Sequence, residues 1–227
     1  MNRWTRRINA MRVSHHIPEE MLLAYAAGSA PEAWSLLVAT HLSLCAECRA
    51  AVGRTEKFGG ALLEGLEPAT LDDDAFDHLM RAIDNSPDVE DEARPVEKIP
   101  SVLPEPLRSY VGGDLHALKW RRLGAGAFHI PIVTKDGTAH ARLLKVPAGK
   151  PVPMHGHNGE ELTLVLTGSF STYQGDFHRG DVEAADADVE HMPVAGPEED
   201  CICLAVTDAP LRFRSLAARI VQPFIGI

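Results

Sequence analysis

The first part of the chain has apolar residues at helical spacing. Between residues 31 and 45 the large side chains recur every three or four positions, which gives a helix one apolar face. Residues 18–28 form a shorter segment of this kind, with a proline and two acids at its beginning and a glycine at its end. After the glycines in 53–60, residues 71–84 are again amphipathic, with an apolar face that is either core or a docking surface. The pattern therefore predicts three helices.

From residue 110 onward the period changes to that of β-strands. Short runs of β-branched or alternating apolar residues are separated by Gly, Pro and Asp turns. These runs cover residues 127–133, 139–146, 162–173, 201–208 and 219–225. Closely spaced strands without intervening helices indicate an all-β barrel or sandwich.

A proline- and acid-rich segment separates the two parts of the chain. It has too few large apolar residues to pack by itself, which is typical of a linker. The expected fold class is α+β as two domains, with a small all-α domain over 1–88, a linker over 89–108 and an all-β domain over 109–227. With 227 residues, 45% of them apolar, the chain is long enough to build two modest cores.

The charge of the chain is uneven and argues against direct binding of nucleic acid. The net charge is -10, and residues 51–100 hold 13 acidic and 5 basic side chains. Because an acidic surface repels phosphate backbones, we expect no direct nucleic-acid partner. The acidic block from Glu64 to Glu97 either faces a basic protein or is a solvated linker.

The chain lacks the sequence features of a membrane or secreted protein. No stretch approaches the roughly 18 to 20 consecutive apolar residues of a membrane span. The basic segment 1–12 lacks the apolar core and cleavage site of a secretory signal. We therefore expect a cytoplasmic protein without a membrane partner. In that compartment the cysteine pairs at 45/48 and 201/203 favour metal ligation or redox sensing over structural disulfides.

A candidate metal site lies at the end of the second predicted helix. His41, Cys45 and Cys48 are four and three residues apart, which brings their side chains to one side of a helix and its end. Zinc prefers four tetrahedral nitrogen and sulfur ligands, and the fourth is either His16 or His15, of which His16 lies nearer the first helix. Such a closed site has no position for catalysis, so its role is structural or redox-responsive. The ligand order and spacing differ from those of a DNA-reading zinc finger.

A second candidate metal site lies among the predicted strands. His155 and His157 are separated by one residue, so on a strand they point to the same side. The Glu161 carboxylate can reach the same centre after a turn, and Glu160 is a weaker alternative. This group predicts a site of imidazole nitrogens and a carboxylate oxygen.

The N-terminal segment resembles the zinc-binding anti-sigma domain. That domain carries a histidine, a long gap and then the motif His-x₃-Cys-x₂-Cys, and the chain matches it at His16, His41, Cys45 and Cys48. The resemblance implies that these four residues hold a zinc ion.

Residues 149–191 resemble the two cupin motifs. Residues 149–168 follow the pattern G-x₅-H-x-H-x₃-E-x₆-G, and the Gly-Asp pair at 180–181 followed by a histidine follows the second motif. His178 is a departure, because cupins usually have proline there, and it puts the geometry of that turn in question. The resemblance implies a jelly-roll barrel whose metal ligands are His155, His157, Glu161 and His191.

The barrel site leaves the identity of its metal open. Three histidines and one carboxylate suit Zn, Fe, Mn or Ni. The resemblance favours zinc, which would give two zinc ions per chain.

Most of the chain thus resembles the ChrR-like zinc-binding anti-sigma factors. The resemblance implies that the helical domain sequesters an extracytoplasmic-function sigma factor. Our hypothesis is that apolar helix faces bind it, with Phe76, Leu79 and Met80 as the candidate contact residues. The cupin domain would be needed for the response to singlet oxygen or organic peroxide, and the protein would not be an enzyme. Any small-molecule ligand of the cupin domain is unknown. The alternatives are a cupin dioxygenase or isomerase with an accessory zinc domain, and a structural or storage metal-binding protein.

Cys201 and Cys203 form the second cysteine pair. One residue separates them, so on a strand both point the same way, toward the barrel interior near the metal. We expect a packing role, and the functional alternative is a pair of oxidisable thiols, which would need partly exposed thiolate character.

Overall fold

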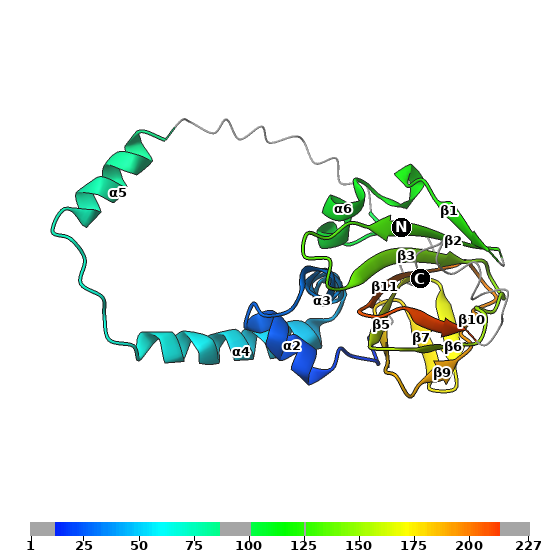
Figure 1. Ribbon diagram of the computed structural model, residues 1–227. Coiled ribbons are helices and arrows are strands. Elements are labelled where there is room, and N and C mark those ends of the chain that lie inside the picture. The colour runs from blue at the N-terminus through cyan, green and yellow to red at the C-terminus, as the bar shows by residue number, and fades with distance from the viewer. Residues whose placement is uncertain (1–11, 87–100, 125, 214–227) are drawn as a thin grey trace.

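A computed structural model describes residues 12–86, 101–124 and 126–213. The predicted strand at 219–225, most of the basic segment 1–12 and the linker residues 89–100 lie outside the described residues. A group of N-terminal helices is followed by a β-rich domain (Figure 1), which confirms the predicted fold class.

The N-terminal helices begin where the sequence provides prolines, acids or a cap. The prolines at 18 and 31 immediately precede α2 and α3, and the first turn contains two acids in α2 and one in α3. At the start of α4, the Cys45 sulfur accepts a hydrogen bond from the backbone N–H of Cys48 at 3.4 Å. The helices are α2 (Glu19–Ala26), α3 (Glu32–Leu44), α4 (Ala46–Glu64) and α5 (Ala75–Asp84).

Helix α4 was not among the three helices that the sequence pattern predicts. It continues through Gly53, Gly59 and Gly60, where the pattern suggested a break between helices. A glycine inside a helix costs only about 1 kcal/mol relative to alanine, and no proline occurs before Pro68 to interrupt the hydrogen bonds. Burial of Cys48 and Val52 holds the first half of this helix against the rest of the protein.

Within its described residues, the β domain contains one large antiparallel sheet and two small ones. The large sheet has the strand order β1-β2-β3-β11-β5-β8, and the small sheets have the orders β10-β6-β7 and β12-β4-β9. The strands are β1 (Arg121–Gly124), β2 (Ala127–Ile132), β3 (His140–Val146), β4 (His155–His157), β5 (Glu161–Thr167), β6 (Ser169–Thr172), β7 (Gly175–His178), β8 (Val182–Ala185), β9 (Glu190–His191), β10 (Val194–Ala195), β11 (Cys201–Thr207) and β12 (Leu211–Phe213).

The two faces of the large sheet carry different side chains. On β11, Ile202, Leu204 and Val206 belong to the core cluster that includes the N-terminal helices. The alternate residues Cys201 and Cys203 pack in a separate cluster inside the β domain. Every residue of this strand is buried, because helices cover one face and the small sheets cover the other.

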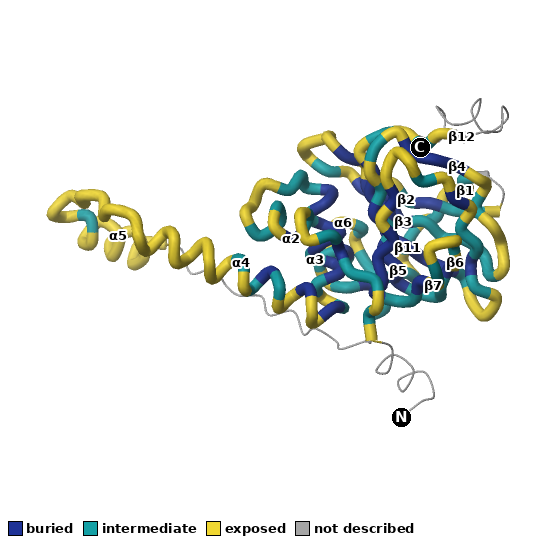
Figure 2. Tube along the Cα trace, turned by 90° about the horizontal axis from the view of Figure 1, so that it is seen from below, coloured by how far each residue is buried: buried dark blue, intermediate teal, exposed yellow. Residues whose placement is uncertain are grey.

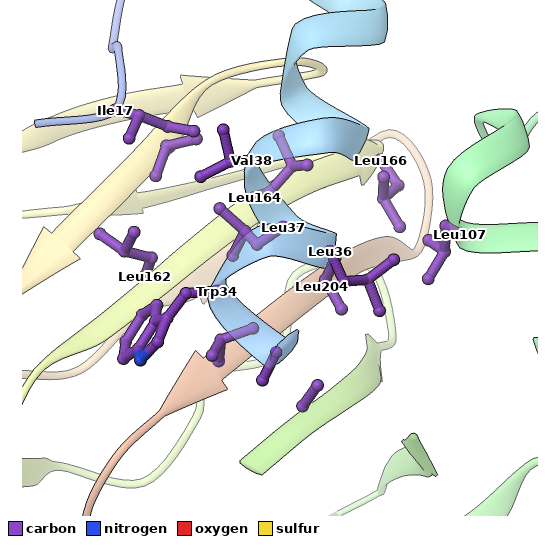
Figure 3. Packing of buried hydrophobic residues seen from close by; sticks show 14 of the residues in the cluster. Ile17, Trp34, Leu36, Leu37, Val38, Leu107, Leu162, Leu164, Leu166 and Leu204 are labelled. Atoms are coloured by element: carbon purple, nitrogen blue, oxygen red, sulfur yellow. The ribbon is translucent and has the colours of Figure 1, made fainter. Parts of the chain in front are cut away.

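Helix α3 packs directly on the large sheet (Figure 3). Its Leu36, Leu37 and Val38 side chains belong to the same buried cluster as Leu164 and Leu204 of the sheet. Leu37, Leu164 and Leu204 are completely buried. The helices and the β domain are therefore joined by one continuous apolar core.

The end of the predicted linker also contributes to this core. Residues 101–108 include the start of α6 (Glu105–Val111), which packs against α3 and is followed by a 3-10 turn (Leu115–Ala117). Leu103 and Leu107 are completely buried. The Asp114 carboxylate accepts hydrogen bonds from the backbone N–H groups of Val102 and Leu103, which fixes the chain as it enters the helix.

The shared core predicts that the helices and the barrel unfold together. Leu37→Ala should lower the free energy of unfolding by about 2–5 kcal/mol, because it leaves a cavity between α3 and the sheet. Urea denaturation followed by far-UV circular dichroism and by tryptophan fluorescence should show one coincident transition at lower urea. The control Leu23→Ala, at a residue 56% exposed on α2, should change the midpoint little. Separate transitions for the two probes would contradict a shared core.

Candidate metal centres

The N-terminal cluster brings together His16, His41, Cys45 and Cys48 from three elements. The four candidate ligand atoms all lie within 4.8 Å of one another. His16 precedes α2, His41 lies in the last turn of α3, and the two cysteines begin α4. The Nδ1 atom of His16 is 3.4 Å from the Cys45 sulfur and 3.5 Å from the Cys48 sulfur. His15 lies elsewhere, with its ring 4.4 Å from the Phe177 ring of the β domain.

A hydrogen bond from His41 to the β domain selects the nitrogen that faces the cluster. Its Nδ1 lies 2.9 Å from the carbonyl oxygen of Gly180, and because a carbonyl only accepts, this nitrogen carries the proton. The Nε2 atom is buried and has no hydrogen-bond partner within the described ranges. Burial lowers the pKa of His41 to about 4, so the ring is neutral and its Nε2 lone pair is available to a metal ion.

The thiols of this cluster are buried as well. Burial raises the pKa of the Cys48 thiol to about 11, with the neighbouring Cys45 adding to the effect. A cation at the centre would favour the thiolates and replace their protons. Two imidazole nitrogens and two sulfurs, all but His16 buried, fit a metal such as zinc, with all four tetrahedral positions filled by protein.

The barrel cluster brings together His155, His157, Glu161 and His191. The four candidate ligand atoms again lie within 4.8 Å of one another. The first two are on β4, Glu161 begins β5, and His191 is on β9, where it pairs directly with His155. The Nε2 atom of His191 lies 3.0 Å from that of His155 and 3.2 Å from that of His157.

Hydrogen bonds behind the rings set the tautomers of two of these histidines. The Nδ1 of His155 donates to the carbonyl oxygen of Pro153 at 2.8 Å, and the Nδ1 of His191 donates to the Glu183 carboxylate at 3.2 Å. Both Nε2 atoms then present lone pairs to each other, an arrangement that a cation between them would stabilise. Burial lowers the pKa of His155 to about 4, so this ring is neutral. The donor set therefore fits a metal ion.

Glu183 is a further candidate site residue, which the sequence motifs did not identify. It lies on β8, is only 2% exposed, and also accepts a hydrogen bond from Thr172 at 3.0 Å. A carboxylate behind a metal-binding imidazole orients the ring and increases its basicity. Its position two residues after the Gly-Asp pair of the second motif is the only sequence signal that pointed to it.

The turn that follows the unusual His178 forms its hydrogen bonds although the usual proline is absent. The Asp181 carboxylate accepts the backbone N–H of His178 at 2.9 Å, and the backbone N–H of Asp181 donates to the carbonyl oxygen of His178 at 2.8 Å. Gly180 supplies the left-handed conformation, with φ +94°. Glu160, the alternative to Glu161, is exposed and lies outside the cluster.

Cys201 and Cys203 lie side by side in the interior of the β domain. Their sulfur atoms are 3.5 Å apart, and both residues pack with Phe170 and Phe177. The hydrogen bond with Cys201, together with burial, raises the pKa of Cys203 well above its ordinary value. Protonated, buried thiols are consistent with the expected packing role.

The cluster at the end of α3 predicts a defined metal content. The variant Cys45→Ala/Cys48→Ala should lose about one metal equivalent per chain relative to the unchanged protein, because two of four ligands are gone. Elemental analysis of dialysed protein measures this. The control Cys201→Ala/Cys203→Ala should keep the full metal content. An equal loss in the control, or none in the first variant, would contradict the assignment.

The buried neutral histidines predict how the stability of the metal-free protein depends on pH. Because the folded-state pKa of His41 and of His155 is about 4 and the ordinary value is 6.5, the unfolded chain binds protons first as the pH falls. Their contribution is present above pH 6.5 and is lost toward pH 4, by a few kcal/mol in all. Urea midpoints at pH 7.5 and 5 should show this decrease. The decrease in midpoint should be the same in the control His116→Gln, at an exposed histidine, and smaller in His155→Gln. A midpoint that does not change between pH 7.5 and 5 would contradict the prediction.

Among the described residues, no single helix is long and apolar enough to cross a bilayer, and only α3 and α4 taken together, bent by 119°, have sufficient length and apolar composition.

Comparisons with known proteins place the chain in a family. Residues 109–210 match the ChrR cupin-like domain. The anti-sigma-E factor ChrR of Cereibacter sphaeroides is 46% identical over 217 residues, which cover 96% of this chain and all of that protein. The crystal structure of Rhodobacter sphaeroides SigE in complex with the anti-sigma factor ChrR matches with a TM-score of 0.75 and 44% identity, covering 86% of this chain and 99% of that one. The chain therefore belongs to the ChrR family of anti-sigma factors.

Proposed function

We propose that the protein sequesters an extracytoplasmic-function sigma factor through its N-terminal helices and thereby represses transcription. The observation that carries this proposal is an exposed apolar face on α4 and α5. The solved complex of a relative with SigE supports the same kind of partner.

The exposed face lies on an arm formed by the second half of α4, the following segment and α5, residues 53–84. This arm extends away from the rest of the protein (Figures 1 and 2), and α5 has no buried residue. Its large apolar side chains are 40–79% exposed: Phe58, Leu62, Leu63, Leu66, Leu71, Phe76, Leu79, Met80 and Ile83. So many unburied apolar side chains on two helices are typical of a surface that a partner protein covers.

The polar side of the arm indicates the charge of that partner. Asp72, Asp73 and Asp74 precede α5, and Asp77 and Asp84 lie within it. Acids beside apolar anchors attract a basic protein and increase its association rate, and the anchors supply most of the affinity. A sigma factor, which itself binds DNA, has the required basic surface.

The N-terminal metal site determines where the arm points. Cys45 and Cys48 begin α4, and His41 ends α3, so a metal ion held by them fixes the bend of 119° between the two helices. In this proposal His16, His41, Cys45 and Cys48 hold zinc, which stabilises the binding shape and performs no chemistry.

The cupin domain is proposed to receive the signal. His155, His157, Glu161 and His191 would hold a second metal ion, which is zinc in our proposal, and singlet oxygen or organic peroxide would lead to release of the sigma factor. The protein then acts in the cytoplasm as a regulator and not as an enzyme.

The arm can be tested separately from the metal sites. Phe76→Ala/Leu79→Ala should weaken binding of the sigma-factor partner by about 10- to 100-fold per anchor, measured by calorimetry on the full chains. Both side chains are more than half exposed, so the melting temperature should not change. Tyr173→Ala, a matched exposed aromatic residue on the β domain, should bind like the unchanged protein.

Two results would contradict the proposal. Unchanged affinity in Phe76→Ala/Leu79→Ala would exclude the arm as the binding surface. Failure of the unchanged protein to bind any sigma factor, together with turnover of a small molecule at the barrel metal, would favour the cupin enzyme instead.

A further inference from the structure

The turn between β7 and β8 joins a residue that contacts the N-terminal metal centre to one that contacts the barrel metal centre. It consists of residues 179–181, and it connects a strand of a small sheet to the edge strand of the large one. At one point, the carbonyl oxygen of Gly180 accepts a hydrogen bond from the N-terminal ligand His41. Further along, the chain continues into Glu183, which accepts a hydrogen bond from the barrel ligand His191. This turn is therefore a short covalent path between the two sites.

The contacts to the N-terminal site are hydrogen bonds to its ligands and to their neighbours. The carbonyl oxygen of Gly180 accepts from His41 at 2.9 Å. The Asp181 carboxylate, 2% exposed, accepts the backbone N–H groups of Ser14 at 2.7 Å and His15 at 2.9 Å. The backbone N–H of Val182 donates to the carbonyl oxygen of His15 at 3.0 Å. The turn thus fixes the backbone immediately before His16 and the ring of His41.

The contacts to the barrel site begin one residue further along the chain. Glu183 accepts hydrogen bonds from His191 and from Thr172, and all three of its neighbours on β8 pair with β5. Within that pairing, Ala185 lies opposite Glu161. A metal ion that draws His191 and Glu161 together therefore also fixes the position of β8.

The packing around the turn leaves little room for independent movement. Gly180 has a left-handed φ of +94°, and a Cβ atom at this position would lie 2.7 Å from the side chain of Val13. The Asp181 carboxylate accepts hydrogen bonds from the backbone N–H of His178, within the turn, and from that of His15, immediately before His16. A displacement of β8 would therefore move the groups that position the N-terminal ligands.

We propose that the Gly180–Asp181 turn couples the two metal sites, so that metal in the barrel slows the release of metal from the N-terminal site. Asp181 and Glu183 act as positioning residues, since neither touches the N-terminal ion. Loss of the barrel metal relaxes β8, weakens the support of His16 and His41, and makes the base of the arm labile. This inference rests on both clusters binding metal, but it requires no sigma factor.

Cobalt(II) allows the N-terminal site to be observed alone. Of the two candidate sites among the described residues, this one alone has cysteine ligands, so a thiolate-to-cobalt charge-transfer absorption reports its metal. The full-length protein, loaded with two equivalents of cobalt(II), is mixed with excess EDTA and the decay of this absorption is recorded. The same measurement is made on His155→Ala/His157→Ala, which lacks barrel ligands, and on Glu183→Gln and Asp181→Asn.

The coupling predicts a specific pattern of decay rates. The unchanged protein should lose its N-terminal cobalt at least about fivefold more slowly than His155→Ala/His157→Ala. Glu183→Gln should release it at an intermediate or fast rate. In Asp181→Asn the release should be fast, and combining it with His155→Ala/His157→Ala should cause no further acceleration.

Asp136→Ala is the matched control. Asp136 accepts the backbone N–H of Glu32 and thus joins the β domain to the other end of α3, far along the helix from the metal ligands. This variant should keep the difference in N-terminal cobalt release between protein with a filled barrel site and protein with an empty one.

Loss of that difference in Asp136→Ala would show a general loosening of the protein and would overturn the coupling through the turn. Equal rates with filled and empty barrels, a full effect persisting in Asp181→Asn, or binding of only one cobalt ion would also overturn it. Sigma-factor binding, measured by calorimetry, tests the proposed function independently.

Discussion

The burial of α3 against the large sheet is the interaction on which the other features depend. This helix contributes apolar side chains to the core on its sheet side, and its last turn carries a candidate metal ligand. At one end of the helix, His41 forms a hydrogen bond with the carbonyl oxygen of Gly180. At the other end, Glu32 forms hydrogen bonds with Lys135 and Asp136 of a loop in the β domain. These bonds at both ends fix the position of the helix along the sheet. The N-terminal metal cluster is therefore assembled partly by the β domain, although all its ligands come from the helical segment.

Much of this arrangement follows from local sequence. Helical spacing identified α2, α3 and α5, because prolines, acids and apolar periodicity act over a few residues. The ligand motifs also identified two groups whose donor atoms converge in the structure, since the spacings at 41–48 and 155–161 are short enough to be read from ideal geometry.

The remaining features depend on contacts between distant segments. Helix α4 was not predicted, because its segment contains three glycines and its first half is stabilised by the burial of Cys48 and Val52. Similarly, Glu183 and Asp181 acquire their roles only when β8 pairs with β5 and the N-terminal segment lies across the turn. Position in a folded sheet, and not residue type, gives these carboxylates their partners.

The glycines of α4 have a consequence for the arm. Gly59 and Gly60 lie in its exposed half, where neither tertiary packing nor side-chain contacts offset their low helix propensity. This half is therefore less stable than the packed first half of α4 and can unfold without disturbing the shared core. A partner that binds it must supply the ordering free energy, which reduces the net affinity and shortens the lifetime of the complex. The glycines in this half of α4 thus increase the dissociation rate of a bound protein while the shared core stays folded.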